Sequence, residues 1–385
     1  MRIGIDTGVL LKERSGVGQY VYHLIDALGA IDSKNSYRLF YDSFGRSILY
    51  PPRLPYQNFS YQRVPGAIKF LKLASGLGRW RLPGFNQLFG STDVFHWPNY
   101  LLIPGGPGKH IITIFDLTFF LFPSYHPPSR VQAYSAGISR SASRADAIIV
   151  ISQHTKRDVM KHLQIPEEKI HVIYCAAAPR FHPISPHDGE PTLSKYSLRR
   201  REYVLYVGNI EPRKNIIRLL EAYSQLATRW RYSSPLVLIG GRGWRNDEVY
   251  KKIEQLSFTI DVRVLGYVPD DDLPALLSGA ALFVYPSLYE GFGMPPLEAM
   301  ACGTPVITSN ASSLPEVVGD AALSVDPNDV EGLAEAMHRV LRNAELCKEL
   351  RRKGLERAKL FSWEETARQT LTIYKNVVAR SSDGK

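Results

Sequence analysis

The sequence has few cysteines and no long apolar run. Its three cysteines, Cys175, Cys302 and Cys347, lie far apart without the spacing of metal ligands, so we expect no disulfide, no zinc site and a reducing compartment. The longest apolar stretch, residues 111–122, is interrupted by Asp116 and is too short to cross a bilayer. The N-terminal string MRIGIDTG lacks the apolar core of a signal peptide. These absences predict a soluble cytoplasmic protein.

The composition excludes a long disordered chain. Of the 385 residues, 44% are hydrophobic and 22% are charged, which is ordinary for a globular protein. The length is typical of two or three domains, each large enough to bury its own core.

The net charge of +10 is confined to one half of the chain. Residues 1–185 contain 21 Lys and Arg against 11 Asp and Glu, whereas the remainder contains 26 of each class. Within residues 63–81, basic side chains alternate with Phe, Leu and Trp, which is typical of peripheral contact with the anionic inner face of the cytoplasmic membrane. A solvated face and a nucleic-acid surface are the alternatives, although no nucleic-acid motif accompanies the charge. The basic residues are Arg63, Lys69, Lys72, Arg79 and Arg81.

Short apolar runs alternate with segments of helical spacing, which predicts α/β domains with doubly wound, largely parallel sheets. The predicted strands are residues 2–6, 37–41, 93–96, 111–114, 147–151, 203–207, 236–240, 262–266, 282–285 and 304–308. The predicted helices are residues 19–28, 129–142, 155–162, 215–226, 248–256, 273–277, 297–302, 330–341 and 362–378. Residues 176–202 are rich in Pro, Ser and charge without an apolar period, which favours a linker. We therefore expect domains at 1–180 and 203–360, a linker at 181–202 and a terminal helix within 361–385.

The most informative stretch is YPSLYEGFGMPPLEAMACGTPVI, which begins directly after a predicted strand. Its loop contains Glu290, Gly291 and Gly293, and a short helix carries Glu298 in its first turn and ends before Gly303, a position that suits a left-handed cap. A helix N-terminus favours a diphosphate, and the glycines let the backbone approach a ligand. A carboxylate accepts hydrogen bonds from vicinal hydroxyls. The pattern therefore indicates a nucleotide-linked sugar, although an isolated pair of Glu residues would be an ordinary helix and surface feature.

Two further strand-to-helix loops favour anions. In GNIEPRKN, Arg213 and Lys214 lie where a helix is predicted to begin, and two adjacent cations there can neutralise a diphosphate. In SGVG, Gly16 and Gly18 form a loop after the first strand, but the third glycine of a dinucleotide fingerprint is missing. An NAD site is therefore weakly supported.

Two further features, the aspartates at 270–272 and the imidazole of His96, have less specific interpretations. Residues 270–272 are three consecutive Asp, which resemble a metal-binding Asp-x-Asp but are better interpreted as an N-cap of the following helix. His96 either lines a binding cleft or lies in the core, and we favour the core.

The string at 290–307 resembles the signature EGFGxPxLEAMAxGxPVI of the family 4 retaining glycosyltransferases, and the resemblance extends over nearly the whole chain. It implies the GT-B fold, in which two Rossmann-like doubly wound domains face each other across a cleft. The first domain would bind the acceptor, the second would bind the nucleotide sugar, and the terminal helix would return to the first domain.

The resemblance also assigns roles to matching residues. Arg213 and Lys214 would bind the donor diphosphate, Glu290 the transferred sugar and Glu298 the ribose. Backbone groups in the glycine loop and the adjoining helix would contact sugar and phosphates, and Gly16 and Gly18 would approach from the first domain. The donor-binding residues of that loop and helix are Gly291, Phe292, Gly293, Met294 and Leu297, and the catalytic residues are Glu290, Arg213, Lys214 and Asp116.

The reaction implied by the resemblance is transfer of a hexosyl group, in particular mannosyl from GDP-mannose, to a hydroxyl of a lipid-linked glycan in cell-surface polysaccharide or lipopolysaccharide assembly. It implies no cofactor and no metal, with a leaving phosphate that helps to deprotonate the acceptor. The alternatives are a UDP-sugar-dependent glycosyltransferase, a soluble disaccharide or glycogen synthase, a sugar-nucleotide epimerase or hydrolase, and a catalytically weak nucleotide-binding relative.

Two positions depart from the family pattern. Asn209 stands where many members have Arg, and Phe115 precedes Asp116 where many members have His. That His helps to position the donor sugar in the family, so its replacement leaves Asp116 as the candidate polar group there and bears on sugar orientation or turnover rate.

Overall fold

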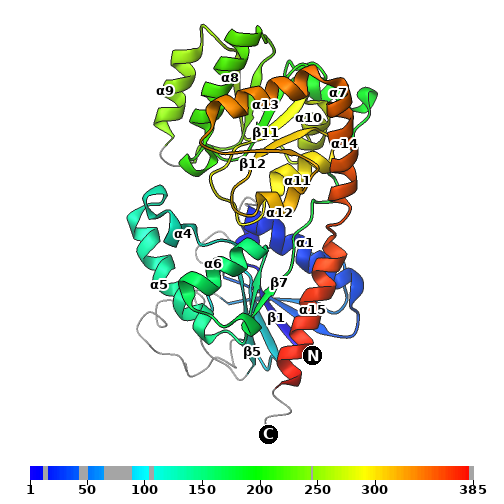
Figure 1. Cartoon of the computed structure of the whole chain (residues 1–385). Helices are drawn as coiled ribbons and strands as arrows, with labels where there is room; N and C mark the ends of the chain where they lie inside the picture. The colour runs from blue at the N-terminus through cyan, green and yellow to red at the C-terminus, as the bar shows by residue number, and fades with distance from the viewer. Residues whose placement is uncertain (12–15, 43–50, 65–88, 104–107, 244–245, 381–385) are drawn as a thin grey trace. The chain divides into compact units, whose positions relative to one another are not determined.

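The computed structural model describes residues 1–385 except 12–15, 43–50, 65–88, 104–107, 244–245 and 381–385. It falls into two compact units (Figure 1). The first unit comprises Met1–Pro123, Pro127–Cys175 and Trp363–Lys385, and the second comprises Ser124–His126 and Ala176–Ser362. In the described part of the chain, no helix is long and apolar enough to span a membrane.

The first unit is built on a seven-stranded parallel sheet with the order β3-β2-β1-β4-β5-β6-β7. All four residues of β4 and of β6 are buried, as expected for strands covered on both faces. The strand order reverses between β1 and β4. The strands are β1 (Arg2–Asp6), β2 (Ser36–Tyr41), β3 (Phe59–Arg63), β4 (Val94–Trp97), β5 (Lys109–Ile114), β6 (Ala147–Val150) and β7 (Ile170–Val172).

Helices connect these strands. The helix after β1 buries Tyr20, Leu24 and Leu28 at helical spacing. It begins at Gly16, so Gly16 and Gly18 lie in its first turn and not in the loop expected from the sequence. The helices before residue 176 are η1 (Gly8–Leu11), α1 (Gly16–Ile31), α4 (Thr118–Leu121), η2 (Pro123–Tyr125), α5 (Pro128–Arg144), α6 (Gln153–Leu163) and η3 (Glu167–Lys169).

The last helix, α15 (Trp363–Ala379), belongs to the first unit and packs on α1. Its Tyr374 is fully buried, and the Tyr374 hydroxyl lies 2.7 Å from Nδ1 of His96. Nε2 of His96 lies 2.8 Å from Oγ1 of Thr113. Burial lowers the pKa of His96 to about 3, so this imidazole is a neutral core residue, as favoured from the sequence.

The second unit is built on a six-stranded parallel sheet with the order β10-β9-β8-β11-β12-β13. Its strands are β8 (Val204–Val207), β9 (Leu236–Ile239), β10 (Val262–Gly266), β11 (Leu282–Tyr285), β12 (Val306–Ser309) and β13 (Leu323–Val325). Its helices are α7 (Pro186–Lys195), η4 (Pro212–Lys214), α8 (Ile216–Trp230), α9 (Asp247–Leu256), α10 (Leu273–Gly279), α11 (Met294–Ala301), α12 (Leu314–Val318), α13 (Val330–Arg342) and α14 (Ala344–Ala358).

The segment expected to be a linker differs from that expectation. Residues 181–202 contain helix α7, which is capped by Ser185 and packs on α10 within the second unit. Its sequence, PHDGEPTLSK, has a Pro inside the helix and few apolar residues, so helical spacing is not visible there. Burial of Gly189 and Leu193 against α10 supplies the stability that the local sequence lacks.

The basic segment expected to contact a membrane, residues 63–81, lies almost wholly outside the described residues. Membrane contact through it stays a prediction.

Candidate functional site

The site forms where the strand order of the second sheet reverses, between the adjacent strands β8 and β11. In open parallel sheets, ligands bind beyond the carboxyl ends of the strands at this point. The chain leaves β8 through Gly208, whose φ of +154° brings the backbone close to that of Gly240 after β9. It leaves β11 through the loop that contains Glu290.

The cations predicted from GNIEPRKN lie on a single 3-10 turn, η4, and not at the start of the long helix. Asn215 follows with φ +61°, and α8 begins only at the next residue. The Asn215 amide donates to the carbonyls of Pro286 (3.0 Å) and Pro327 (2.6 Å), which fixes the turn beside the β11 loop. Arg213 and Lys214 therefore lie on a turn of their own, which ends before α8 begins.

Glu290 is the centre of the charged cluster. Its Oε1 accepts hydrogen bonds from the Lys214 ammonium (2.7 Å), the Ser287 hydroxyl (2.6 Å) and the Tyr285 hydroxyl (3.1 Å). Its Oε2 lies 2.9 Å from an Arg213 guanidinium nitrogen. The Glu290 residue is only 8% exposed, so these partners replace water around the carboxylate.

The cations decide the charge state of Glu290. Burial alone would raise its pKa, but Arg213 and Lys214 outweigh burial and lower the pKa to about 2. Burial and the neighbouring Arg213 cation lower the pKa of Lys214. A second buried carboxylate, Glu211, lies 2.7 Å from Arg213, so two cations face two carboxylates.

The loop that carries Glu290 is held by two serines. The Ser312 hydroxyl accepts from the Glu290 backbone N–H (2.8 Å), and the Ser313 hydroxyl contacts the carbonyls of Glu290 (2.8 Å) and Phe292 (2.6 Å). Gly293 has φ +126°, and a Cβ there would lie 2.8 Å from a Leu314 methyl carbon. This position therefore requires glycine.

Helix α11 begins at Met294, earlier than predicted, and Gly303 has the left-handed φ of +71° that was expected. Residues 291–293 and Leu297 are buried. Pro295 and Pro296 occupy the first turn and have no N–H. Of the first three residues of α11, only Met294 therefore has a backbone N–H.

Glu298 lies in the second turn of α11, not in the first as expected, and it contrasts with Glu290. Its side chain is half-buried, and no hydrogen bond to it is found among the residues that the structure describes. Burial raises the pKa of Glu298 to about 8, with Arg180 opposing and Asp270 reinforcing the shift. The first glutamate is thus paired with cations and ionised, whereas the side chain of the second has no partner among the described residues.

The first unit contains the remaining predicted site residues. Asp116, which follows β5, accepts hydrogen bonds from the Thr118 N–H (3.1 Å) and hydroxyl (2.8 Å) at the start of α4. Phe115 is buried against Tyr20 and Tyr100, with ring centroids 5.0 and 5.7 Å apart. Gly16 is exposed, and a Cβ there would meet nothing within 4 Å.

Several residues at the site were not singled out from the sequence. Glu211, Tyr285, Ser287, Ser312 and Ser313 contact the cations or the Glu290 loop. Of these residues, only Glu211 could have been identified from the sequence, because an acidic residue two positions before Arg213 can reach the Arg213 guanidinium. The serines belong to ordinary loops, and only the fold brings them to Glu290.

Two of the three consecutive Asp residues form ion pairs, and the one at the N-cap position makes no side-chain cap. Asp272 occupies the N-cap position of α10, but its carboxylate binds Lys195 (2.6 Å) and the Tyr196 hydroxyl (2.7 Å) instead of the helix N–H groups. The prediction that an Asp side chain caps this helix is therefore wrong, because Asp272 lies at the N-cap position but accepts no hydrogen bond from a helix N–H. Asp270 pairs with Arg180 at 3.1 Å. Across the described ranges, no group of three His, Cys, Asp or Glu is arranged to hold a metal ion.

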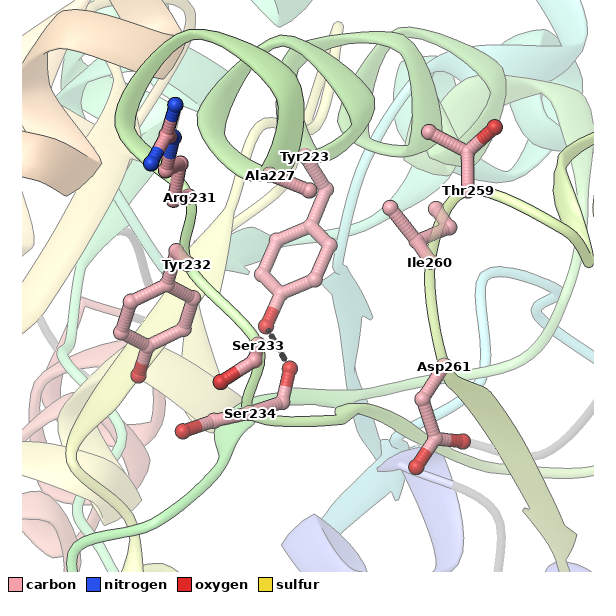
Figure 2. A pocket seen from close by; sticks show the side chains of 9 residues that line it. All are labelled: Tyr223, Ala227, Arg231, Tyr232, Ser233, Ser234, Thr259, Ile260 and Asp261. Atoms are coloured by element: carbon pink, nitrogen blue, oxygen red, sulfur yellow. Dashed lines mark hydrogen bonds between the residues drawn. The ribbon is translucent and has the colours of Figure 1, made fainter.

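A separate cavity of about 380 Å³ lies at the amino ends of β9 and β10. Figure 2 shows the side chains that line it. Within it the Tyr223 hydroxyl donates to the Ser234 carbonyl at 2.6 Å. Amino ends of parallel strands are not where such sheets bind nucleotides, so we do not assign the candidate site there. Its lining residues are Tyr223, Ala227, Arg231, Tyr232, Ser233, Ser234, Thr259, Ile260 and Asp261.

Comparison with known proteins decides the family. Residues 194–357 match the family described as "Glycosyl transferases group 1", and residues 14–180 match "Glycosyltransferase Family 4". A curated relative, "O-antigen chain mannosyltransferase B" of Escherichia coli, is 41% identical over 282 residues, which are 73% of this chain and 74% of that protein. The chain belongs to the family 4, group 1 glycosyltransferases.

Other relatives of this glycosyltransferase extend the comparison. The "Serotype-specific mannosyltransferase WbdA" of Escherichia coli is 36% identical over 250 residues, which are 62% of this chain but 30% of that protein. The solved structure of "Sucrose-phosphate synthase" from Thermosynechococcus elongatus matches with a TM-score of 0.78 and 22% identity, over 98% of this chain and 99% of that chain. The structural likeness shows the GT-B fold with its two parallel-sheet domains, as predicted from the sequence.

Proposed function

We propose that this glycosyltransferase transfers a mannosyl group from GDP-mannose to a hydroxyl of a lipid-linked glycan in cell-surface polysaccharide assembly. The sugar rests on the curated relatives named for O-antigen mannosyl transfer. The base, the lipid-linked acceptor, retention of configuration and independence from metals rest on the family resemblance of the sequence motifs. The peripheral membrane location rests on the basic segment at residues 63–81.

The observation that carries the proposal is the cluster of Arg213, Lys214 and Glu290 at the strand-order reversal. Glu298 lies on α11, which follows the loop of Glu290, and its side chain has no partner among the described residues. A Lys ammonium has three N–H donors. Lys214 uses two of them on Glu290 and Tyr285. The third is available for a phosphate oxygen, and together with Arg213 it would stabilise the charge that develops on a leaving diphosphate.

The two glutamates suit different parts of the donor. An ionised Glu290 can only accept hydrogen bonds, so it fits hydroxyls of the transferred sugar. Glu298 has no described partner, so ribose hydroxyls would supply the hydrogen bonds that its half-buried carboxyl lacks. In the reaction, the bond from the anomeric carbon to the diphosphate breaks as the acceptor oxygen bonds to the same face, and a leaving phosphate oxygen takes the acceptor proton.

A thermal-shift series would test the donor. The ligands are GDP-mannose, UDP-glucose, UDP-N-acetylglucosamine, GDP and UDP, each at about 100 times its dissociation constant, where a domain of this size gains roughly 5–11 °C. Shifts with the guanine compounds support the proposal. Shifts with uracil compounds alone would replace GDP-mannose by a UDP-sugar.

A turnover assay with and without EDTA, followed by NMR assignment of the anomeric configuration of the product, tests the chemistry. Unchanged turnover in EDTA and a product with the donor's anomeric configuration are expected. Inversion of configuration would reject the retaining mechanism, and loss of turnover in EDTA would reject independence from metals.

One observation favours a second candidate, a catalytically weak nucleotide-binding relative. Phe115 lies in an aromatic cluster, and Asp116 is engaged by Thr118, so no described imidazole replaces the His of the family pattern at this position. This candidate predicts thermal shifts with nucleotides but no transfer to any acceptor.

A further inference from the structure

Three arginines of the second unit gather at the amino-end side of its sheet, away from the Glu290 cluster. Arg200 and Arg201 lie just before β8, and Arg351 lies on α14. Each is half-buried. In the part of the chain that the structure describes, none of the three pairs with a carboxylate, in contrast to the exposed Arg199, which lies 3.9 Å from Glu202.

The local contacts place Arg200 and Arg351 on the same side of the unit. One Arg200 nitrogen donates to the Ile184 carbonyl at 3.2 Å. Next to Ile184, Pro183 lies 3.8 Å from the Cβ position of Gly303, and Leu355 of α14 lies 3.7 Å from the same position. Arg351 precedes Leu355 by four residues and shares its helix face.

Arg201 completes the cluster. Its guanidinium donates to the Ala280 carbonyl at 2.9 Å, and its backbone N–H donates to the Gly279 carbonyl at 2.7 Å, both at the end of α10. Its φ of +66° is uncommon for a residue with a side chain. Burial, then Arg351 and then Arg200 lower the pKa of Arg201 to about 10, so both of these cations act on the Arg201 guanidinium.

Two buried donors of the cluster are unsatisfied. Nη1 of Arg200 and Nε of Arg351 are both inaccessible to solvent, and neither has a hydrogen-bond partner among the described residues. Buried polar groups are almost always paired, so orphaned ones require an explanation. Like charges held together without a counter-charge are also unfavourable. An anion between the guanidinium groups would remove both costs.

We infer that Arg200, Arg201 and Arg351 form a binding site for a phosphate group, distinct from the proposed donor site. Guanidinium groups present planar pairs of N–H donors that match phosphate oxygens. The phosphate group can belong to a free phosphate or to a lipid headgroup, and both share the chemistry that the three arginines recognise. The site goes beyond the proposed transferase activity, because it lies at the opposite end of the β8 strand from Lys214.

The first test measures melting temperature with and without inorganic phosphate, with NaCl adjusted to keep ionic strength constant. The proteins are the parent chain, Arg351→Gln, Arg200→Gln/Arg351→Gln and the control Arg352→Gln, whose arginine is exposed and pairs with Glu356 on the same helix. All are made in a Lys214→Ala background, so that phosphate at the proposed donor site does not contribute.

We expect phosphate to raise the melting temperature of the parent and of the control. The dissociation constant, measured by calorimetry, should rise roughly 10- to 100-fold for each arginine removed from the cluster. Without phosphate, Arg351→Gln should melt at or above the parent temperature, because repulsion is relieved. Equal phosphate gains in all four proteins, or a lower melting temperature of Arg351→Gln without phosphate, would overturn the site.

The second test separates the two sources of phosphate. Flotation with phosphatidylglycerol vesicles is compared with phosphatidylcholine vesicles for the parent and the double variant. Binding to the anionic vesicles that the double variant loses assigns a lipid headgroup, whereas phosphate protection without vesicle binding assigns a free phosphate. If the parent shows neither phosphate protection nor vesicle binding, the site is rejected.

Discussion

The two glutamates of the signature stretch differ more than their shared motif suggests. Glu290 is surrounded by two cations and two hydroxyl groups, which keep it ionised although it is buried. Glu298, eight positions later on α11, has no described hydrogen-bond partner, and burial raises its pKa. The difference arises from the 3-10 turn η4, whose two cations contact Glu290 and do not contact Glu298.

The largest expected effect comes from Glu290→Gln. The substitution leaves the buried Lys214 cation without its carboxylate partner, and breaking a buried pair destabilises a protein by about 3–5 kcal/mol. Urea unfolding measures this loss, and a transfer assay should show loss of turnover. A loss below about 1 kcal/mol would show that the pair behaves like a surface salt bridge.

The sign of the Glu290 effect also depends on pH. The folded pKa of about 2 is below the unfolded value, so Glu290 stabilises the fold above the unfolded pKa, and this stabilisation is lost as pH falls from about 4.5 towards 2. The parent should therefore lose stability in this range more steeply than Glu290→Gln. Parallel curves of unfolding free energy against pH would contradict the low pKa.

Lys214→Ala should affect turnover more than stability. Arg213 still pairs with Glu290 in this variant, so the carboxylate keeps one cation. A hydrogen bond to a charged group contributes about 1.5–3 kcal/mol, and we expect a loss of that size in transition-state stabilisation, measured as kcat/KM for the donor. Lys252→Ala, which removes a half-buried ion-pair partner of Glu221, is the control. Equal losses in both variants would exclude a role for Lys214 in the reaction.

Glu298→Gln separates binding from stability. Because the folded pKa is raised to about 8, the folded protein holds a proton that the unfolded chain has released, and stability falls as pH rises from about 4.5 to 8. Gln removes this fall, so the variant should be more stable than the parent at pH 8, by about 1–3 kcal/mol.

Donor affinity should nevertheless fall in Glu298→Gln, and Glu298→Ala should weaken donor binding by about 1.5–3 kcal/mol. Calorimetry with the donor measures both variants, and unchanged affinity in Glu298→Ala would remove Glu298 from the site.

The smallest expected effect is indirect. Arg180 lowers the pKa of Glu298, so Arg180→Met should raise that pKa further, by less than about one unit for a partly exposed neighbour. Carboxyl titration by NMR would detect the shift. An unchanged pKa would show that Arg180 interacts with Asp270, its partner at 3.1 Å, and has no effect on Glu298.

Much of the fold follows from sequence periodicity. Strands such as β6 and β11 are short apolar runs that parallel packing buries on both faces, and these were predicted within one residue. Strands β3, β7 and β13 were missed because none of them is fully buried and their sequences are mixed. Helix α7 was missed because its stability comes from packing on α10.

The sequence motifs name candidate residues for the site but not their geometry. They point to Arg213, Lys214, Glu290 and Glu298, and the structure brings the first three into direct contact. The turn that detaches Arg213 and Lys214 from α8 depends on the left-handed Asn215, which no local pattern requires. The opposite surroundings of the two glutamates depend on long-range packing, which sequence spacing does not report.

The return of α15 to the first unit has a consequence for biosynthesis. A ribosome delivers the nearly continuous second unit, 176–362, before the helix that completes the first. Until Tyr374 emerges, Nδ1 of His96 in the first sheet lacks its hydroxyl partner, so the unit translated first is the last to be finished. Nascent chains stalled before residue 363 should therefore hold a protease-resistant second unit and a protease-sensitive first one.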